Sequence, residues 1–266
     1  MKRRREMTVR ELNRLLDQRF PPALSCDWDN DGLQVSPDPA AAVTGVLVAL
    51  DPSDAAIDRA AETGCNVILT HHPLIFRPLE GVTPDCGVGR RLERLLSLGI
   101  SAISCHTRAD AAQGGLNEYL AGRIGLTDVA PFADGIPRIG VLKKPMPVAE
   151  AVAFVLGATG MPKALYSGKA PTTVTRIAIC CGDGKDCLSA AAEAGADLYF
   201  TGEMSYHSRL DADELGLLVT EVGHDRSEMH CRGVFRAFLA EAAPEIRVVE
   251  GPCSPSDGFS GGRLDI

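Results

Sequence analysis

The sequence predicts an α/β protein of two related α/β domains, each built on a mostly parallel sheet. Two observations predict this class. Apolar strand-like segments alternate with segments of helical periodicity, and the connections between them are short. Residues 50–70 also align without gaps with residues 181–201, so that Gly64 meets Gly195 and Thr70 meets Thr201. Because parallel strands need crossover helices, we expect helices on both faces of each sheet.

The first domain is expected to begin with a helix over residues 8–19. Thr8 can cap this helix, and Glu11, three residues on, completes the capping-box pattern. An irregular loop then leads into a strand that ends near Val35. The remaining elements expected here are strands at 43–50, 67–70 and 100–105 and helices at 52–63, 88–98 and 113–123, with Asp51 or Ser53 at the start of the second helix and Gly64 and Gly99 as helix-ending residues.

The regular pattern loosens between residues 126 and 138, which include two prolines and a glycine. We place the domain boundary there, which gives domains at 1–126 and 127–250 and an irregular tail at 251–266. The elements expected in the second domain are strands at 139–142, 176–181, 197–201, 216–220 and 246–250 and helices at 147–159, 186–194 and 227–242.

Composition excludes several classes of function. The net charge of -8 and the pI of about 5.3 give no general basic surface, so nucleic acid is not an expected partner. The chain has no apolar run long enough to span a membrane, and its basic residues 2–5 precede no signal-like apolar region. Nine scattered cysteines form no C-x-x-C motif. We therefore expect free thiols and a cytoplasmic location.

Two adjacent histidines follow the expected strand at 67–70. Pro73 forbids further pairing of that strand, so His71 and His72 lie at its carboxyl end. Open α/β sheets bind their ligands at this end of their strands. Two imidazoles in this position favour a metal site. The alternative is that one histidine caps the strand and the other is merely exposed.

Further candidate ligands follow other expected strands. His106 and Asp110 are spaced i, i+4, as are His224 and Glu228, so each pair shares a face if the turn after its strand is helical. Imidazole and carboxylate together suit a borderline transition metal. These residues offer more ligands than one tetrahedral zinc ion can bind. Their number favours two ions bridged by a carboxylate such as Glu228. The alternative for each pair is a surface ion pair.

The loop between residues 26 and 35 contains three aspartates: Asp27, Asp29 and Asp31. Three carboxylates in a loop can bind calcium, but the spacing of an EF-hand is absent. We therefore expect a solvated turn.

Five motifs together carry a family resemblance. They are Trp28-Asp-Asn-Asp-Gly-Leu-Gln34, Thr70-His-His-Pro73 with Leu74-Ile-Phe76, His106-Thr-Arg-Ala-Asp110, Thr201-Gly-Glu203 with His207, and Gly223-His224 with Glu228. With these motifs the chain resembles, from about residue 8 to residue 250, the GTP cyclohydrolase I type II homologue family, also called the Nif-three-like proteins. Asp31 departs from the apolar residue expected at its position, and Ser36 departs from glycine.

The resemblance implies a two-domain chain with a dinuclear metal centre in the cleft between domains, assembled as a toroidal homohexamer. Glu228 would contact both ions, and His106 and His207 would line the site as acid–base or supporting groups. By matched position, the ligands would be His71, His72, Asp110, His224 and Glu228.

Two divalent ions about 3.5–4 Å apart can activate water and stabilise an oxyanion. This chemistry favours hydrolysis of a nucleotide-like or other small substrate, although no Walker loop is present to hold a triphosphate. The mixed ligand set admits Zn, Fe, Mn, Co or Ni. A competing hypothesis is a non-catalytic metal-binding adaptor or metallochaperone. A third is that the histidines bind metal only as a structural staple.

Overall fold

The structure, a computed structural model, describes residues 6–252 as two compact units. The first unit comprises residues 6–109 and 231–252, and the second comprises residues 110–230. These units differ from the predicted domains at 1–126 and 127–250, because the last helix and strand of the chain return to the first unit. Of the predicted tail at 251–266, residues 253–266 lie outside the described residues.

The sheet of the first unit has the order β1-β4-β3-β2-β11. Strands β4, β3, β2 and β11 run parallel, and β1 is antiparallel to β4. Ala49 pairs with Thr70, and Thr70 pairs with Ser104, so the carboxyl ends of β2, β3 and β4 lie level with one another. These strands are β1 (Gly32–Val35), β2 (Val46–Ala49), β3 (Val67–Thr70), β4 (Ser101–Ser104) and β11 (Val248–Glu250).

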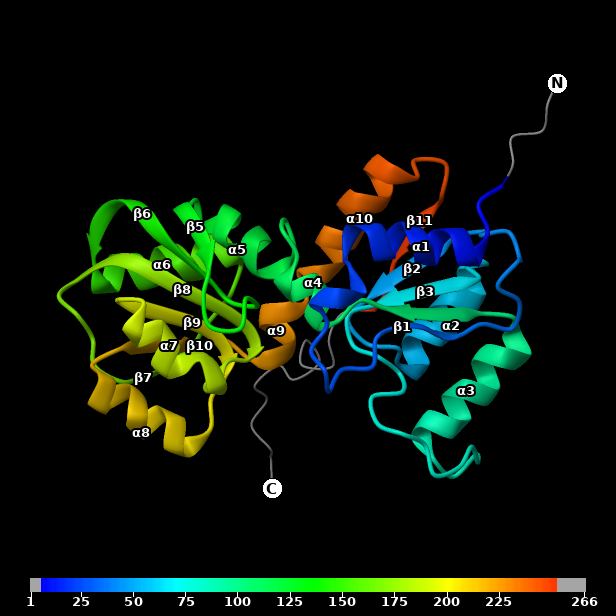
Figure 1. The fold of residues 1–266 in the computed structure, drawn as a ribbon, viewed down its shortest axis with the longest axis horizontal. Helices are drawn as coiled ribbons and strands as arrows, with labels where there is room; N and C mark the ends of the chain where they lie inside the picture. Colours follow the sequence, from blue (N-terminus) through cyan, green and yellow to red (C-terminus); the bar gives the residue numbers. More distant parts are fainter. Residues whose placement is uncertain (1–5, 253–266) are drawn as a thin grey trace, which may run out of the picture. The chain divides into compact units, whose positions relative to one another are not determined.

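Four helices cover this sheet, three of them predicted for the first domain and one, the last helix of the chain, predicted for the second. Helices α2 (Asp54–Thr63) and α3 (Gly87–Leu98) bury Ile57 and Leu95 in one apolar cluster with Leu47 and Ile68 of the sheet. Neighbouring side chains of a strand point to opposite faces of the sheet. Helix α10 (Cys231–Ala242) contacts β2 from the face opposite α2 and α3, near α1 (Val9–Arg19). Figure 1 shows α10 in orange and β11 in red joining the blue and cyan elements of this unit.

Local sequence signals set the helix ends in this unit. Thr8 and Glu11 form the predicted capping box at the start of α1. Helix α2 is capped by Ser53, whose hydroxyl accepts from the N–H of Ala56. Gly64 and Gly99 end α2 and α3 with φ angles of 66° and 71°, a left-handed conformation in which a side chain is strained. The predicted bounds of these helices are confirmed to within two residues.

The second unit has a mixed sheet with the order β5-β6-β8-β9-β10-β7. Only β8, β9 and β10 run parallel; the β5, β6 and β7 pairings are antiparallel. The expectation of a mostly parallel sheet is thus wrong for this half, while the α/β class is confirmed. The strands are β5 (Thr127–Pro131), β6 (Arg138–Pro147), β7 (Leu165–Ser167), β8 (Thr173–Asp183), β9 (Leu198–Glu203) and β10 (Leu218–Glu221).

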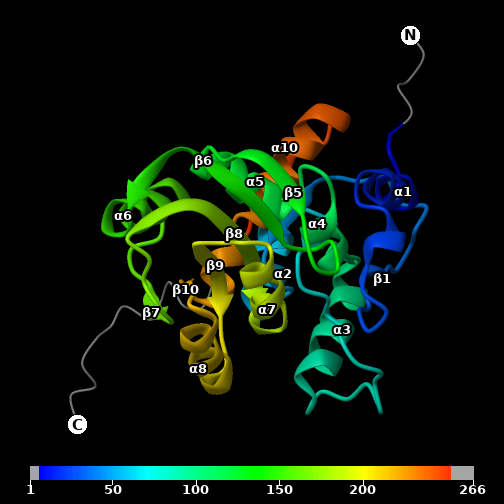
Figure 2. The same ribbon diagram turned by 60° about the vertical axis from the view of Figure 1, so that its left-hand side comes forward.

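Helices pack on this second sheet as well (Figure 2). Leu188 of α7 and Ala212 of α8 join Cys180, Tyr199 and Val219 of the sheet in one apolar cluster. Helices α5 and α6 contact β6 and β8. The helices of this unit are α5 (Leu116–Ile124), α6 (Val148–Thr159), α7 (Leu188–Glu193), α8 (Tyr206–Leu215) and α9 (His224–Glu228); α4 (Thr107–Ala111) begins in the first unit, and short 3-10 turns lie at Pro22–Leu24 and Lys185–Cys187.

The predicted internal repeat has a structural counterpart. Strands β2 and β3 and the helix between them match β8, α7 and β9, and both strand pairs are parallel. Ala49 pairs with Thr70 in the first unit, and the aligned residues Cys180 and Thr201 pair in the second. The repeat therefore preserves the pairing register as well as the order of elements.

Four helices or strands were not predicted: α4, β5, β7 and α8. In addition, the helix predicted at 227–242 is two helices, α9 and α10, that belong to different units.

No helix within residues 6–252 combines the length and the apolar character that crossing a membrane requires. None of the eight cysteines described forms a disulfide.

Candidate metal centre

The level ends of β3 and β4 bring three histidines together in the first unit. His71 and His72 follow β3, and His106 follows β4. The ring centroid of His71 lies 5.1 Å from that of His72 and 5.1 Å from that of His106, and His72 and His106 are 5.5 Å apart. One ligand atom from each residue lies within 4.8 Å of the other two. This group can hold a metal ion, as the sequence predicted for the end of β3.

Each of these imidazoles is held through its Nδ1 atom. Nδ1 of His71 lies 3.1 Å from the carbonyl oxygen of Cys105, and Nδ1 of His72 lies 2.7 Å from Oδ1 of Asp51. Nδ1 of His106 lies 2.9 Å from Oδ1 of Asp29. A carbonyl or carboxylate oxygen only accepts, so it selects the tautomer with the proton on Nδ1 and the lone pair on Nε2. Metal-binding histidines are oriented in the same way.

The aspartate loop supports this histidine cluster and is not the solvated turn that we expected. Asp29 is fully buried at its side chain, where it accepts from the N–H and the hydroxyl of Thr107 at 3.1 and 2.6 Å as well as from His106. Burial opposes the charge on Asp29, but the hydrogen bonds from His106 and Thr107 outweigh it and lower the pKa of Asp29 to about 2. Of the three aspartates, only Asp27 is exposed as expected.

Asp31 has a different buried partner, Arg108. Oδ2 of Asp31 lies 3.0 Å from Nε of Arg108 and accepts from the N–H of His106 at 3.0 Å. Arg108 is only 1% exposed, and it also donates to Asp17 at 2.7 Å and to the carbonyl oxygen of Ser104 at 3.0 Å. Burial raises the pKa of Asp31 even though Arg108 opposes the shift.

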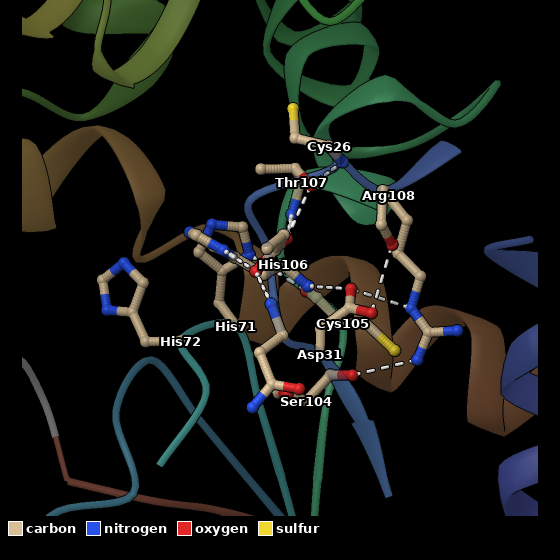
Figure 3. Close-up of polar contacts among 12 residues, drawn as sticks. Cys26, Asp31, His71, His72, Ser104, Cys105, His106, Thr107 and Arg108 are labelled. Carbon is tan, nitrogen blue, oxygen red and sulfur yellow. Dashed lines mark hydrogen bonds and ion pairs between the residues drawn. The ribbon is translucent and has the colours of Figure 1, made fainter. Parts of the chain in front are cut away.

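These contacts fix the turn that carries His106. Figure 3 shows the histidines on one side of the close-up and Arg108 with Asp31 on the other. Sequence reasoning missed Arg108 and the roles of Asp29 and Asp51. Charged residues are seldom fully buried, and the sequence analysis gave Arg108 no role beyond its place in the motif His106-Thr-Arg-Ala-Asp110. The signal that was available is the departure at position 31, where a carboxylate replaces the expected apolar residue, together with an arginine in the turn after a buried strand.

Asp29 is expected to fix the orientation of His106. In Asp29→Asn the amide provides one acceptor oxygen for three donors, so the variant should lose about 1–3 kcal/mol of stability and the fixed Nδ1–H tautomer of His106. Nitrogen chemical shifts of the imidazole and unfolding by urea measure these effects. Asp27→Asn, in the same loop but exposed, is the matched control and should change neither. Equal behaviour of the two variants would contradict this role for Asp29.

The second unit contains the other predicted pair. Residues 224–228 form helix α9, so His224 and Glu228 share a face as predicted, with Nε2 of His224 lying 3.2 Å from Oε2 of Glu228. Nδ1 of His224 lies 2.9 Å from Oε1 of Glu203. That bond again places the lone pair on Nε2. Two acceptors at 3.2 Å repel each other unless a cation or an added proton satisfies both, which suits a shared metal ion.

Two glycines make room for this pair at the ends of β8 and β9. A Cβ on Gly182 would lie 2.2 Å from Oε1 of Glu228, and one on Gly202 would lie 2.9 Å from Cα of His224. In the internal repeat Gly202 aligns with His71. The first unit thus uses a histidine where the second unit uses a glycine that lets α9 approach the sheet.

The two remaining predicted site residues are Asp110 and His207. Asp110 lies in α4, so the turn after His106 meets the condition set for that pair, that it be helical, and Asp110 is buried. His207 is exposed on α8, in ring contact with Tyr206 at 5.2 Å, and its role stays a prediction. A pocket of about 300 Å³ in the first unit is lined by Asp51, Pro52, Ser53, Pro73, Leu74 and Arg91.

Comparisons with known proteins agree with these motifs. The family model described as Duf34/NIF3 (NGG1p interacting factor 3) matches residues 7–255. A Clostridium perfringens protein called GTP cyclohydrolase 1 type 2 homolog is 34% identical, over 84% of this chain and 87% of its own. A Schizosaccharomyces pombe protein called NIF3 homolog is 31% identical, over 87% of each chain.

A solved structure gives the same result for the fold. The crystal structure of a Staphylococcus aureus hypothetical protein superposes with a TM-score of 0.83 and 25% identity, covering 92% of this chain and 96% of the other. The identities of the two relatives, 34% and 31%, and the match of the family model to residues 7–255 lead to one conclusion. The chain belongs to the Duf34/NIF3 family.

Proposed function

We propose that the protein binds two divalent metal ions and acts as a metal-dependent hydrolase on a nucleotide-like or other small substrate. The observation that carries this proposal is the common orientation of the histidines. His71, His72, His106 and His224 each contact an oxygen acceptor through Nδ1, which leaves the lone pair on Nε2. The proposed ligands are His71, His72, Asp110, His224 and Glu228.

Bound divalent ions would supply activation of water and stabilisation of negative charge. The residues of the chain have separate tasks. Asp51 and Glu203 orient His72 and His224 for binding. His106 is proposed as an acid–base group that acts through Nε2, because Asp29 accepts from its Nδ1–H and so fixes the tautomer. His207 is proposed as a second acid–base group. The pocket lined by Asp51 and Pro73 has room for a small substrate.

The printed names of the relatives support the reaction class without establishing it for this chain. A relative is called a GTP cyclohydrolase 1 type 2 homolog, and opening of a purine ring is a hydrolysis at a C–N bond. The description of the family as an interacting factor favours a second candidate. In that case the protein is a metal-binding adaptor or metallochaperone without turnover.

The test is a screen of metal-loaded protein against nucleotides, phosphoesters and amides. The hydrolase proposal expects turnover of at least one class, and loss of that turnover in His72→Ala. Glu62→Gln, on the exposed surface of α2, is the control and should keep the activity. Turnover that survives in His72→Ala contradicts the proposal. Metal binding with no turnover of any class favours the adaptor.

We also propose a homohexamer in the cytoplasm, on the ground of family resemblance. Light scattering of the purified protein tests the assembly, for which the proposal expects the mass of six chains. A monomer at all concentrations would contradict it.

A further inference from the structure

Two exposed aromatic rings flank the histidine cluster of the first unit. Trp28 is 61% exposed and Phe76 is 42% exposed. Their ring centroids lie 5.9 Å apart, and each lies 6.0 Å from the ring of His106. The three rings meet edge to face, at angles of 68–79°. Trp28 and Phe76 therefore form an aromatic corner that includes one side of His106 and remains open to solvent.

Hydrogen bonds hold in place the two segments that carry these rings. Trp28 lies between Cys26, whose N–H donates to the hydroxyl of Thr107 at 3.0 Å, and Asp29, which is bound to His106. Phe76 follows Ile75, and both backbone polar groups of Ile75 are bonded to the side-chain amide of Gln34, at 3.0 and 2.8 Å. A site that is already ordered loses little conformational entropy when a ligand binds.

The chemistry of the corner selects one class of ligand. Large aromatic side chains are normally buried, and these two are exposed next to a group of imidazoles with lone pairs on Nε2. Aromatic faces bind planar rings by stacking, whatever the substituents of those rings. A ring stacked on the corner would lie within reach of the acid–base group proposed for His106.

We propose that Trp28 and Phe76 bind the planar nitrogen-containing aromatic ring of the substrate, such as a nucleobase, beside His106. The proposal rests on the proposed function, because it names the part of the substrate that the same site recognises. It predicts that a free base or nucleoside binds, and that a sugar or a sugar phosphate without the ring does not.

The chain offers a direct probe, since Trp28 is its only tryptophan. Selective excitation of tryptophan reports on this site alone. Guanosine, cytidine and nicotinamide are expected to quench the fluorescence of Trp28 in a saturable way, and ribose 5-phosphate is not. Phe76→Ala should weaken binding of the quenching ligand about tenfold, the loss typical of one stacked aromatic residue.

Phe154→Ala is the matched control. Phe154 has the same exposed fraction as Phe76, 42%, and lies on α6 of the second unit. The control should bind like the unsubstituted protein. Equal weakening in Phe76→Ala and Phe154→Ala, or equal quenching by ribose 5-phosphate, would overturn the proposal, as would the absence of quenching by all three ring compounds. Urea unfolding of both variants shows whether either has lost its fold, and quenching in the unsubstituted protein needs no variant.

Three further outcomes distinguish this inference from the hydrolase proposal and from contact between copies of the chain. Saturable quenching without turnover of any substrate supports the ring site and contradicts only the proposal that the protein is a hydrolase. Turnover whose KM is the same in Phe76→Ala supports the hydrolase and overturns the ring site. A change of Trp28 fluorescence with protein concentration alone, with a smaller assembly in Phe76→Ala, would show that another copy covers the rings, and it too would overturn the proposal.

Discussion

Replacing His72 with alanine is expected to lower the affinity for a divalent metal ion by more than about 100-fold. Loss of a residue that merely orients a ligand typically costs 10–100-fold in affinity, and loss of the ligand itself should cost more. His72 is the suitable position because it is only partly buried, whereas His71 is fully buried and its truncation would leave a cavity. Competition with a chromogenic chelator, using zinc or manganese, measures the affinity.

His207→Ala is the control for this experiment. His207 is exposed on α8 and is not a proposed ligand, so the variant should keep the metal affinity of the unsubstituted protein. The same variant tests the acid–base role separately, through turnover. An unchanged affinity in His72→Ala would contradict the assignment of His72 as a ligand.

Truncation of Arg108 is expected to cost about 3–5 kcal/mol of stability. Arg108→Ala leaves the buried carboxylate of Asp31 without its cationic partner, and an uncompensated buried charge is strongly destabilising. It also removes the donors to Asp17 and to the carbonyl oxygens of Phe20 and Ser104. Urea unfolding followed by far-ultraviolet circular dichroism measures the loss.

A double variant tests the reason for that loss. In Asp31→Leu with Arg108→Met both charges are replaced by apolar groups, so the double variant should be more stable than Arg108→Ala. Arg59→Ala, which removes an exposed cation at a 3.6 Å ion pair with Glu62, should change stability by less than about 1 kcal/mol. A loss in Arg108→Ala as small as that in Arg59→Ala would contradict the structural role of Arg108.

The parts of the fold that the sequence predicted rest on signals within a few residues. Thr8 and Glu11 define the start of α1, and Gly64 and Gly99 define helix ends, because each signal acts inside one helical turn. The strand at 67–70 was predicted to the residue, since Pro73 ends its pairing. The level ends of β3 and β4 then follow from parallel pairing.

The parts that were missed depend on partners far along the chain. Asp29 and Asp31 resemble a solvated turn until residues 106–108 are placed beside them. β11 belongs to the first unit because it pairs with β2, roughly two hundred positions earlier in the sequence, and no local pattern reports such a pairing. Helix α8 was missed for a different reason. Its only buried apolar residue is Ala212, so it lacks a hydrophobic stripe.

The residues of the candidate site likewise include some that the sequence predicted and some that it missed. His71, His72, His224 and Glu228 were proposed from their positions after strands and from i, i+4 spacing. The oxygen partners of His72 and His106 were missed, because Asp51 was considered only as a helix cap and Asp29 as a loop residue. A better rule is available in the topology: a carboxylate that directly follows a strand lies at the same edge of the sheet as a histidine that follows the neighbouring strand.

Anomalous diffraction from crystals grown with zinc tests the central claim most directly. If the Nδ1 hydrogen bonds orient the histidines for metal binding, a zinc peak will lie about 2.0–2.1 Å from Nε2 of His72. Nδ1 of His72 will remain on Asp51. Zinc bound through Nδ1 with the Asp51 contact broken, or crystals saturated with zinc that show no peak at any of these histidines, would contradict the account.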